Sequence, residues 1–252
     1  MIKHILSSAA LIATFSFTGN AMVDNEEIIL DSTSKYHTKE PSLTLSADIK
    51  SRHTWRGNLT CTALNIQPTL DLKISKITLG AWGCYTADNS YAEVDLYAIY
   101  HMGPLSFSLL DYYSPNEAVK QNDFFQFDRK TTRHIVDANM TYQSTSRLPI
   151  RFMVGTMVYG DDRKDSTGTN RYSTYLEAGY TLNLSNIQKI DFFVGGTPHK
   201  SLYGKRAGIV NIGLTAHQKT KIFKQYDLPV YASIIINPMT ENIFFVIGIT
   251  IL

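Results

Sequence analysis

The feature that most constrains this chain is a pattern that repeats from Ser42 to the last residue. Runs of about ten residues alternate apolar and polar side chains, and clusters of Gly, Pro, Asn, Asp and Ser separate the runs. A period of two is typical of strands whose two faces meet different surroundings, and no run follows the helical period. The pattern predicts an all-β fold of long strands.

Twelve such runs can be delimited, at residues 42–55, 64–74, 77–86, 91–101, 104–114, 131–142, 148–159, 171–182, 187–197, 208–217, 228–237 and 242–252. Single-chain barrels of bacterial outer membranes have even strand counts and strands of about 9–11 residues. The gaps after even-numbered runs are short except for 218–227, whereas three gaps after odd-numbered runs, 115–130, 160–170 and 198–207, are long. This alternation predicts a transmembrane, antiparallel, up-and-down β-barrel of about 12 strands over residues 42–252.

The first 41 residues differ from the rest and predict export. Lys3 and His4 precede an apolar run at 5–17, and Gly19 and Ala21 supply the small residues that a signal peptidase reads. We expect a signal peptide at 1–21 and a polar periplasmic tail at 22–41. The predicted location is the outer membrane of a Gram-negative bacterium.

Composition excludes two classes of protein and gives no support to a third. A chain with 44% hydrophobic and 18% charged residues is neither disordered nor a helical membrane protein. It contains no Lys/Arg run of five, so a nucleic-acid partner is not expected.

The polar face of the runs carries charge, which a wet lumen tolerates and a soluble sandwich core does not. The predicted pore-lining residues are Asp48, Lys50, Arg52, Asp71, Lys73, Glu93, Asp95, Arg133, Asp137, Arg151, Arg171, Glu177 and Asp191. With Arg56 included, seven basic residues face seven acidic ones, and such a balance predicts no strong ion preference.

Two runs depart from simple alternation. Leu109, Leu110 and Asp111 are consecutive, and a bulge is needed if Asp111 is to avoid lipid. The last run, 242–252, is apolar on both faces, which predicts a packed inner face.

Five short segments carry a family resemblance: SRHTWRG at 51–57, GAWG at 80–83, EVDLY at 93–97, DYYSPN at 111–116 and ENIFF at 241–245. They resemble segments of the TorF-like porins and related uncharacterised outer-membrane barrels, over most of the chain after the tail. The resemblance implies a channel role. Such barrels usually end in an aromatic residue that the outer-membrane assembly machinery reads, whereas this chain ends in Ile251 and Leu252. This difference bears on assembly efficiency more than on fold.

Catalysis and metal binding have little support in the sequence. The seven histidines are scattered without metal-ligand spacing, so neither a metal nor another cofactor is expected. An outer-membrane lipid hydrolase would need a Ser and a His facing outward on neighbouring strands. His134 is the one candidate for the His, and no suitable Ser accompanies it. We therefore expect no enzyme.

The two cysteines, Cys61 and Cys84, form a possible disulfide because an exported chain meets an oxidising compartment. A turn at Ser75 and Lys76 would pair Cys84 with Gln67, which leaves Cys61 six residues, or ~20 Å, along the strand. The bond forms only if the first loop folds back. The alternative is two unpaired thiols.

The predicted function is an outer-membrane channel for passive diffusion of small polar solutes. Its expected partners are those solutes, outer-membrane lipid and lipopolysaccharide, and the assembly machinery. A basic loop with His199, Lys200, Lys205 and Arg206 either attracts lipopolysaccharide phosphates or anionic solutes, or is simply solvated. A closed structural or adhesive surface barrel, a lipid hydrolase and a soluble secreted sandwich remain alternatives. The solute and the oligomeric state stay open.

Overall fold

The computed structural model describes residues 40–116, 118–144, 148–164, 167–222 and 226–251, so the predicted signal peptide and nearly all of the predicted tail lie outside the described residues. The strands are β1 (Ser42–Lys50), β2 (His53–Trp55), β3 (Asn58–Cys61), β4 (Asn65–Ile74), β5 (Ile77–Thr86), β6 (Ala92–Met102), β7 (Leu105–Tyr113), β8 (Ile135–Gln143), β9 (Ile150–Gly160), β10 (Thr174–Ser185), β11 (Gln188–Thr197), β12 (Gly208–Ile222), β13 (Tyr226–Asn237) and β14 (Asn242–Ile251). None of these residues belongs to a helix long and apolar enough to cross a membrane.

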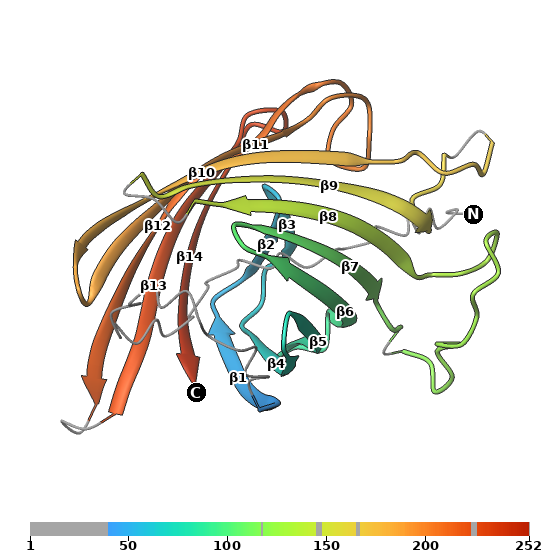
Figure 1. Ribbon diagram of the computed structural model, residues 1–252. Helices are drawn as coiled ribbons and strands as arrows, with labels where there is room; N and C mark the ends of the chain where they lie inside the picture. The colour runs from blue at the N-terminus through green and yellow to red at the C-terminus, as the bar shows by residue number, and fades with distance from the viewer. Residues whose placement is uncertain (1–39, 117, 145–147, 165–166, 223–225, 252) are drawn as a thin grey trace, which may run out of the picture.

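Twelve of the strands, β1 and β4–β14, close into one antiparallel barrel (Figure 1). Each strand pairs with its neighbour in the chain, and β1 closes the ring by pairing with both β4 and β14. The predicted all-β class and barrel of about 12 strands are confirmed.

The prediction of one strand over 42–55 is wrong. β1 ends at Lys50, the chain bends, and β2 then pairs with β3 in a separate two-stranded sheet. The turn between β2 and β3 consists of Arg56 and Gly57, with φ values of 46° and 80°. Two consecutive positive φ values are what a two-residue hairpin turn requires, and glycine adopts one without steric cost. The alternating pattern continues through 53–55 because this segment is also a strand, but one that belongs to another sheet.

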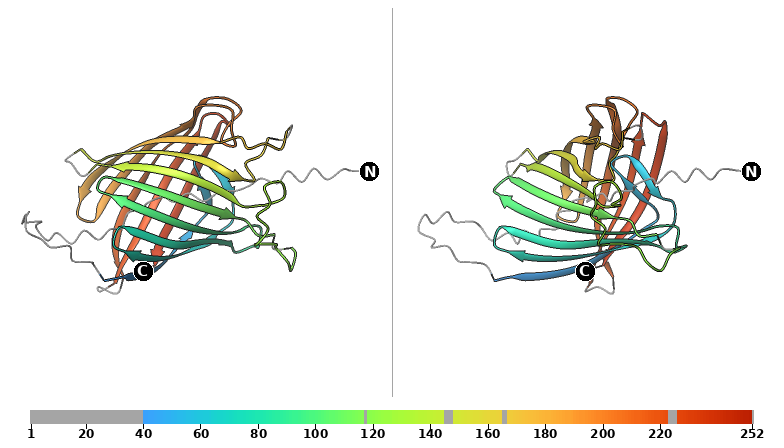
Figure 2. Two further views of the ribbon diagram at one scale, coloured as in Figure 1. Left: turned by 45° about the vertical axis from the view of Figure 1, so that its right-hand side comes forward. Right: turned by 90° about the vertical axis from the view of Figure 1, so that its right-hand side faces the viewer.

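The two ends of the barrel differ in the length of their connections (Figure 2). At one end, called the turn end, lie the start of β1, the end of β14 and short turns such as that at Ser75 and Lys76. At the other, the loop end, lie the long connections 114–134, 161–173 and 198–207. The expected long gap at 218–227 is wrong, because β12 and β13 stay paired as far as Ile222 and Tyr226.

The outer surface of the wall is an apolar belt. Side chains such as Leu70, Leu96 and Ile234 are each more than two-fifths exposed on the outside of their strands. The inner face carries aromatic and polar side chains, many of them buried. On β14 the inner residues Phe244 and Val246 are buried, so the prediction of a packed inner face for this run is confirmed.

The predicted bulge at Asp111 is wrong. Asp111 lies on the outer face of β7, where its carboxylate has a partner. The pairing of β7 with both neighbours is continuous through Asp111. Its carboxylate lies 2.9 Å from Nδ1 of His134, and Nε2 of His134 lies 2.6 Å from the carbonyl oxygen of Phe124. The rings of Phe124, Phe127 and Tyr113 pack around the imidazole. The 114–134 loop thereby covers the carboxylate.

Candidate functional site

The β2–β3 hairpin lies inside the ring of barrel strands (Figure 1). We call residues 53–61 the plug. At its tip, Gly57 packs so closely on β12 that a Cβ atom there would lie 1.9 Å from the carbonyl oxygen of Val210. On β13, Nδ2 of Asn237 donates a hydrogen bond of 3.1 Å to the carbonyl oxygen of Gly57. The plug therefore reaches across the lumen and touches the wall on strands far from its own attachment.

Arg56 anchors the tip of the plug. Its guanidinium donates to Asp137 (2.8 Å) and Asn139 (2.9 Å) on β8 and to the hydroxyl of Tyr203. The ring centroids of Trp55, Tyr175 and Tyr203 lie 4.5, 5.0 and 5.4 Å from its Cζ atom. Burial lowers the pKa of Arg56, but Tyr203 and Asp137 outweigh it and hold the pKa above its ordinary value. A buried cation with these partners is a strong and geometrically specific anchor.

Apolar contacts hold both sides of the plug. Trp55 packs edge-on against Tyr112 and tilted against Tyr203, within the main buried cluster of the lumen. Leu59 packs against a second buried cluster that includes Phe244 and Val246. Together with the anchored tip, these contacts hold the plug against the inner face of the wall.

The foot of the plug joins the wall through buried polar groups. Nε2 of Gln67 donates to Nδ1 of His53 and to Oδ1 of Asn65, both over 2.9 Å. Burial, with a smaller contribution from Lys50, lowers the pKa of His53. A neutral His53 fits its contact, because a side-chain amide nitrogen can only donate and Nδ1 must accept.

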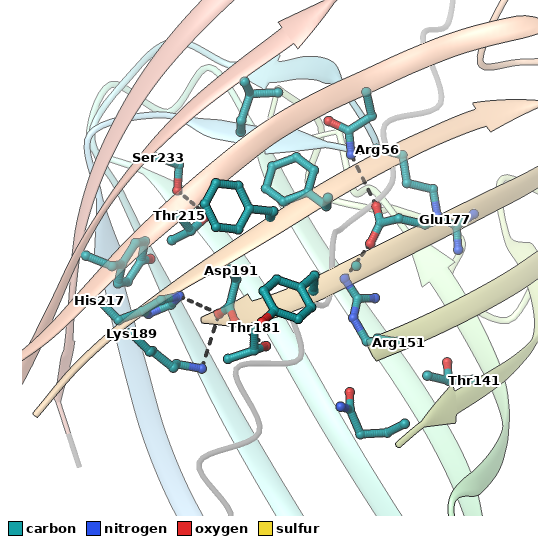
Figure 3. A pocket seen from close by; sticks show the side chains of 18 of the residues that line it. Arg56, Thr141, Arg151, Glu177, Thr181, Lys189, Asp191, Thr215, His217 and Ser233 are labelled. Atoms are coloured by element: carbon teal, nitrogen blue, oxygen red, sulfur yellow. Dashed lines mark hydrogen bonds and ion pairs between the residues drawn. The ribbon is translucent and has the colours of Figure 1, made fainter. Parts of the chain in front are cut away.

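A cavity of about 750 Å³ lies between the plug and the turn end (Figure 3). Its wall carries three ion pairs: Arg151 with Glu177 at 2.5 Å, Lys189 with Asp191 at 3.2 Å and Lys50 with Asp48 at 3.4 Å. Hydroxyls and imidazoles complete the lining, such as Thr181 and His217, which contact Asp191 at 2.6 and 2.9 Å. The cavity thus combines these charged and hydrogen-bonding groups with apolar side chains such as Phe193, Ile235 and Val246.

Six of the predicted pore-lining residues line this cavity: Asp48, Lys50, Arg52, Arg151, Glu177 and Asp191. Three others, Glu93, Asp95 and Asp137, are fully buried on the lumen side of the wall and do not line it. Asp71 also faces inward and accepts a hydrogen bond of 2.5 Å from Tyr97, with Lys73 two residues further along β4.

Two predicted positions are wrong. Arg133 and Arg171 precede β8 and β10 and lie in loops at the loop end, because the two strands begin later than their alternating patterns suggest. The side chain of Arg133 is exposed and donates to the carbonyl oxygen of Ser114.

The predicted balance of seven basic and seven acidic residues does not describe the cavity. Among the described residues, its lining carries five basic side chains, Lys50, Arg52, Arg56, Arg151 and Lys189, against the acids Asp48, Glu177 and Asp191. Lys189 and His217 were not predicted as lining residues, although Lys189 lies on the same face of β11 as Asp191 and could have been found by alternation.

Cys61 and Cys84 are not bonded to each other in this structure. The first loop does fold back into the barrel, which is the condition that a bond required. Cys61 therefore lies at the foot of the plug, beside Cys84 on β5.

His134 makes polar contacts through both nitrogens of its ring. Both ring nitrogens are occupied, one by the Asp111 carboxylate and the other by a carbonyl oxygen, so neither faces a nucleophile. Over the described part of the chain, no three His, Cys, Asp or Glu side chains are placed to hold a metal ion.

No family model matches the chain, and no curated protein is similar enough to be recognised as a relative. Among solved structures, the chain is similar to Wzi, an outer-membrane protein involved in group 1 capsule assembly in Escherichia coli and described as a carbohydrate-binding β-barrel. The identity is 10% and the TM-score 0.34, over 76% of this chain and 52% of Wzi, so the chain spans about half the length of that protein.

Proposed function

We propose that this protein is an outer-membrane diffusion channel for small polar solutes, gated by the plug. Membrane insertion is supported by the apolar belt: large side chains such as Leu70 and Leu96 are exposed around the wall, and an exposed apolar surface this extensive is rare on soluble monomers. The charged side chains in the lumen also favour a membrane barrel over a soluble fold, because a soluble core does not tolerate such charges. We infer that this barrel faces the periplasm with its turn end, because the short turns and both barrel termini lie there.

One observation carries the channel proposal: a cavity of about 750 Å³ with charged side chains lies inside the barrel, and the plug residues His53, Thr54, Arg56 and Gly57 line it. A barrel of about eight strands is filled by its own side chains, whereas a wider barrel such as this one can leave room for a solute. The resemblance of five segments to TorF-like porins supports the same role.

The plug is the proposed gate because its nine residues are attached to the wall only by short bends, after Lys50 and before Asn65. Movement of this one hairpin would join the cavity to the loop end. We expect solutes no larger than the cavity to pass, without a cofactor or a catalytic residue.

The test is planar-bilayer conductance of residues 22–252 and of a variant in which 53–61 is replaced by a short Gly-Ser linker. We expect rare, brief openings from the full chain and long-lived discrete steps from the variant. If the variant stays silent while its migration on gels remains heat-modifiable, the barrel is folded and the channel proposal fails. That outcome would favour the closed surface barrel, which the buried tip of the plug also fits.

A further inference from the structure

We propose that Cys61 and Cys84 are a disulfide-forming pair, and that their bond fastens the plug to the barrel wall. The consequence of the bond for gating rests on the proposed function, because the bond would hold the proposed gate. The bond itself can be detected whether or not the barrel is a channel.

The two thiols lie on either side of one side chain at the foot of the plug. Cys61 is the last residue of β3, and Cys84 lies on the inner face of β5. Both thiols contact the side chain of Asn65: its Nδ2 lies 3.6 Å from Sγ of Cys61, and its Oδ1 lies 3.8 Å from Sγ of Cys84. Two thiols that flank one side chain in this way need little movement to bond.

The surroundings favour one chemistry. Both cysteines are buried, at 6% and 0% exposure, and no other metal-ligating side chains among the described residues combine with them into a metal site. The neighbouring Cys84 lowers the pKa of Cys61, which makes the Cys61 thiol the better nucleophile of the two. An exported chain folds in a compartment that oxidises such pairs.

The reaction is thiol–disulfide exchange with an oxidant that itself carries a disulfide, such as oxidised glutathione or an oxidoreductase. The Cys61 thiolate attacks the oxidant's disulfide and releases one thiol of the oxidant, which leaves a mixed disulfide on Cys61. The Cys84 thiolate then attacks the Cys61 sulfur and releases the oxidant's second thiol. One S–S bond forms in this chain, and the oxidant leaves as two thiols, which take up the two protons and two electrons. Because both sulfurs are buried once the plug has docked, we expect the exchange to occur during folding.

The bond would remove one of the two hinges on which the plug can swing. The leg that leads from Cys61 to β4 comprises only residues 62–64. With Cys61 joined to β5, this leg is fixed to the wall, and the hairpin can no longer leave the lumen as a unit. Reduction would restore that freedom.

Thiol mapping tests the bond. Residues 22–252 are refolded in detergent with oxidised and reduced glutathione, denatured in N-ethylmaleimide and weighed intact with and without prior reduction. We expect no maleimide adduct before reduction, two afterwards, and a linked peptide that contains both cysteines. A Cys84→Ser variant is the control and should carry one adduct or a mixed disulfide. Two adducts on the unreduced chain would overturn the inference.

A second measurement tests the fastening without using conductance. In a Trp82→Phe, Arg56→Ala chain, Trp55 is the one tryptophan and the tip anchor is absent. We expect reduction to increase quenching of Trp55 by iodide at least twofold, and to have no effect when Cys61→Ser and Cys84→Ser are added. Equal quenching before and after reduction of a bonded chain would show that the bond does not hold the plug. Neither measurement depends on whether the barrel conducts, so failure of the channel proposal would leave both results readable.

Discussion

Replacement of Arg56 by alanine is the sharpest perturbation of the plug. The change removes the two hydrogen bonds to Asp137 and Asn139 and leaves the Asp137 carboxylate fully buried without its cation. Breaking a buried ion pair by removing one partner costs about 3–5 kcal/mol. Since about 1.4 kcal/mol corresponds to a factor of ten, the docking equilibrium of the plug should weaken by roughly a hundredfold to a few thousandfold.

A matched control is available in the same lumen. Arg151 also pairs with one carboxylate, that of Glu177, but the side chain of Arg151 is 31% exposed and that of Glu177 12%. Solvent-screened pairs contribute about 0–1 kcal/mol, so Arg151→Ala should change plug docking little. The contrast separates loss of the anchor from a general loss of lumen charge.

Trp55 supplies the assay, because it lies in the plug at 4% exposure and the chain has only one other tryptophan. In a Trp82→Phe chain refolded in detergent under reducing conditions, Arg56→Ala should shift the emission of Trp55 to longer wavelength and increase its quenching by iodide. Arg151→Ala should leave both unchanged. If Trp55 stays buried after Arg56→Ala in a barrel that remains folded, the account of Arg56 as the anchor is refuted.

Three further changes test other parts of the account. Gly57→Ala places a Cβ against Val210 at a φ of 80°, so it should undock the plug as Arg56→Ala does, as read from Trp55 quenching. Leu70→Arg, on the apolar belt, should lower the free energy of unfolding in lipid vesicles by about 2–4 kcal/mol, whereas a change within about 0.5 kcal/mol in urea titration would place that face in water. His134→Leu leaves Asp111 without its donor and should destabilise the barrel by about 1–3 kcal/mol, while His199→Leu on an exposed loop should not; equal unfolding midpoints would contradict the role given to His134.

The strand count and the two faces of the wall could be predicted from the sequence because both follow from a local period of two. Asp48, Lys50, Arg151, Glu177 and Asp191 were found in this way, since alternation alone decides which face each occupies. Strand ends are less well determined by alternation, and Arg133 and Arg171 were misplaced for that reason.

The plug could not be predicted, because its residues continue the alternating pattern of β1 without interruption. The signal that could have revealed it is Arg56 followed by Gly57, a pair suited to a two-residue hairpin turn. The partners of Arg56 come from β8, β10 and the 198–207 loop, and no short-range pattern links positions so distant in the chain. The bulge at Asp111 was predicted wrongly for a similar reason. Its partner His134 directly precedes β8, and no short-range pattern links the two residues.

The central claim is that the lumen is a solute pathway that the plug closes, and osmotic swelling of proteoliposomes tests it most directly. Liposomes that contain the full chain, or the variant with 53–61 replaced by a linker, are diluted into isotonic solutions of uncharged sugars of increasing size. The account predicts swelling with the variant at rates that fall steeply as the sugar grows, and much slower swelling with the full chain. Swelling no faster than that of protein-free liposomes, from a variant whose barrel is folded, would contradict it.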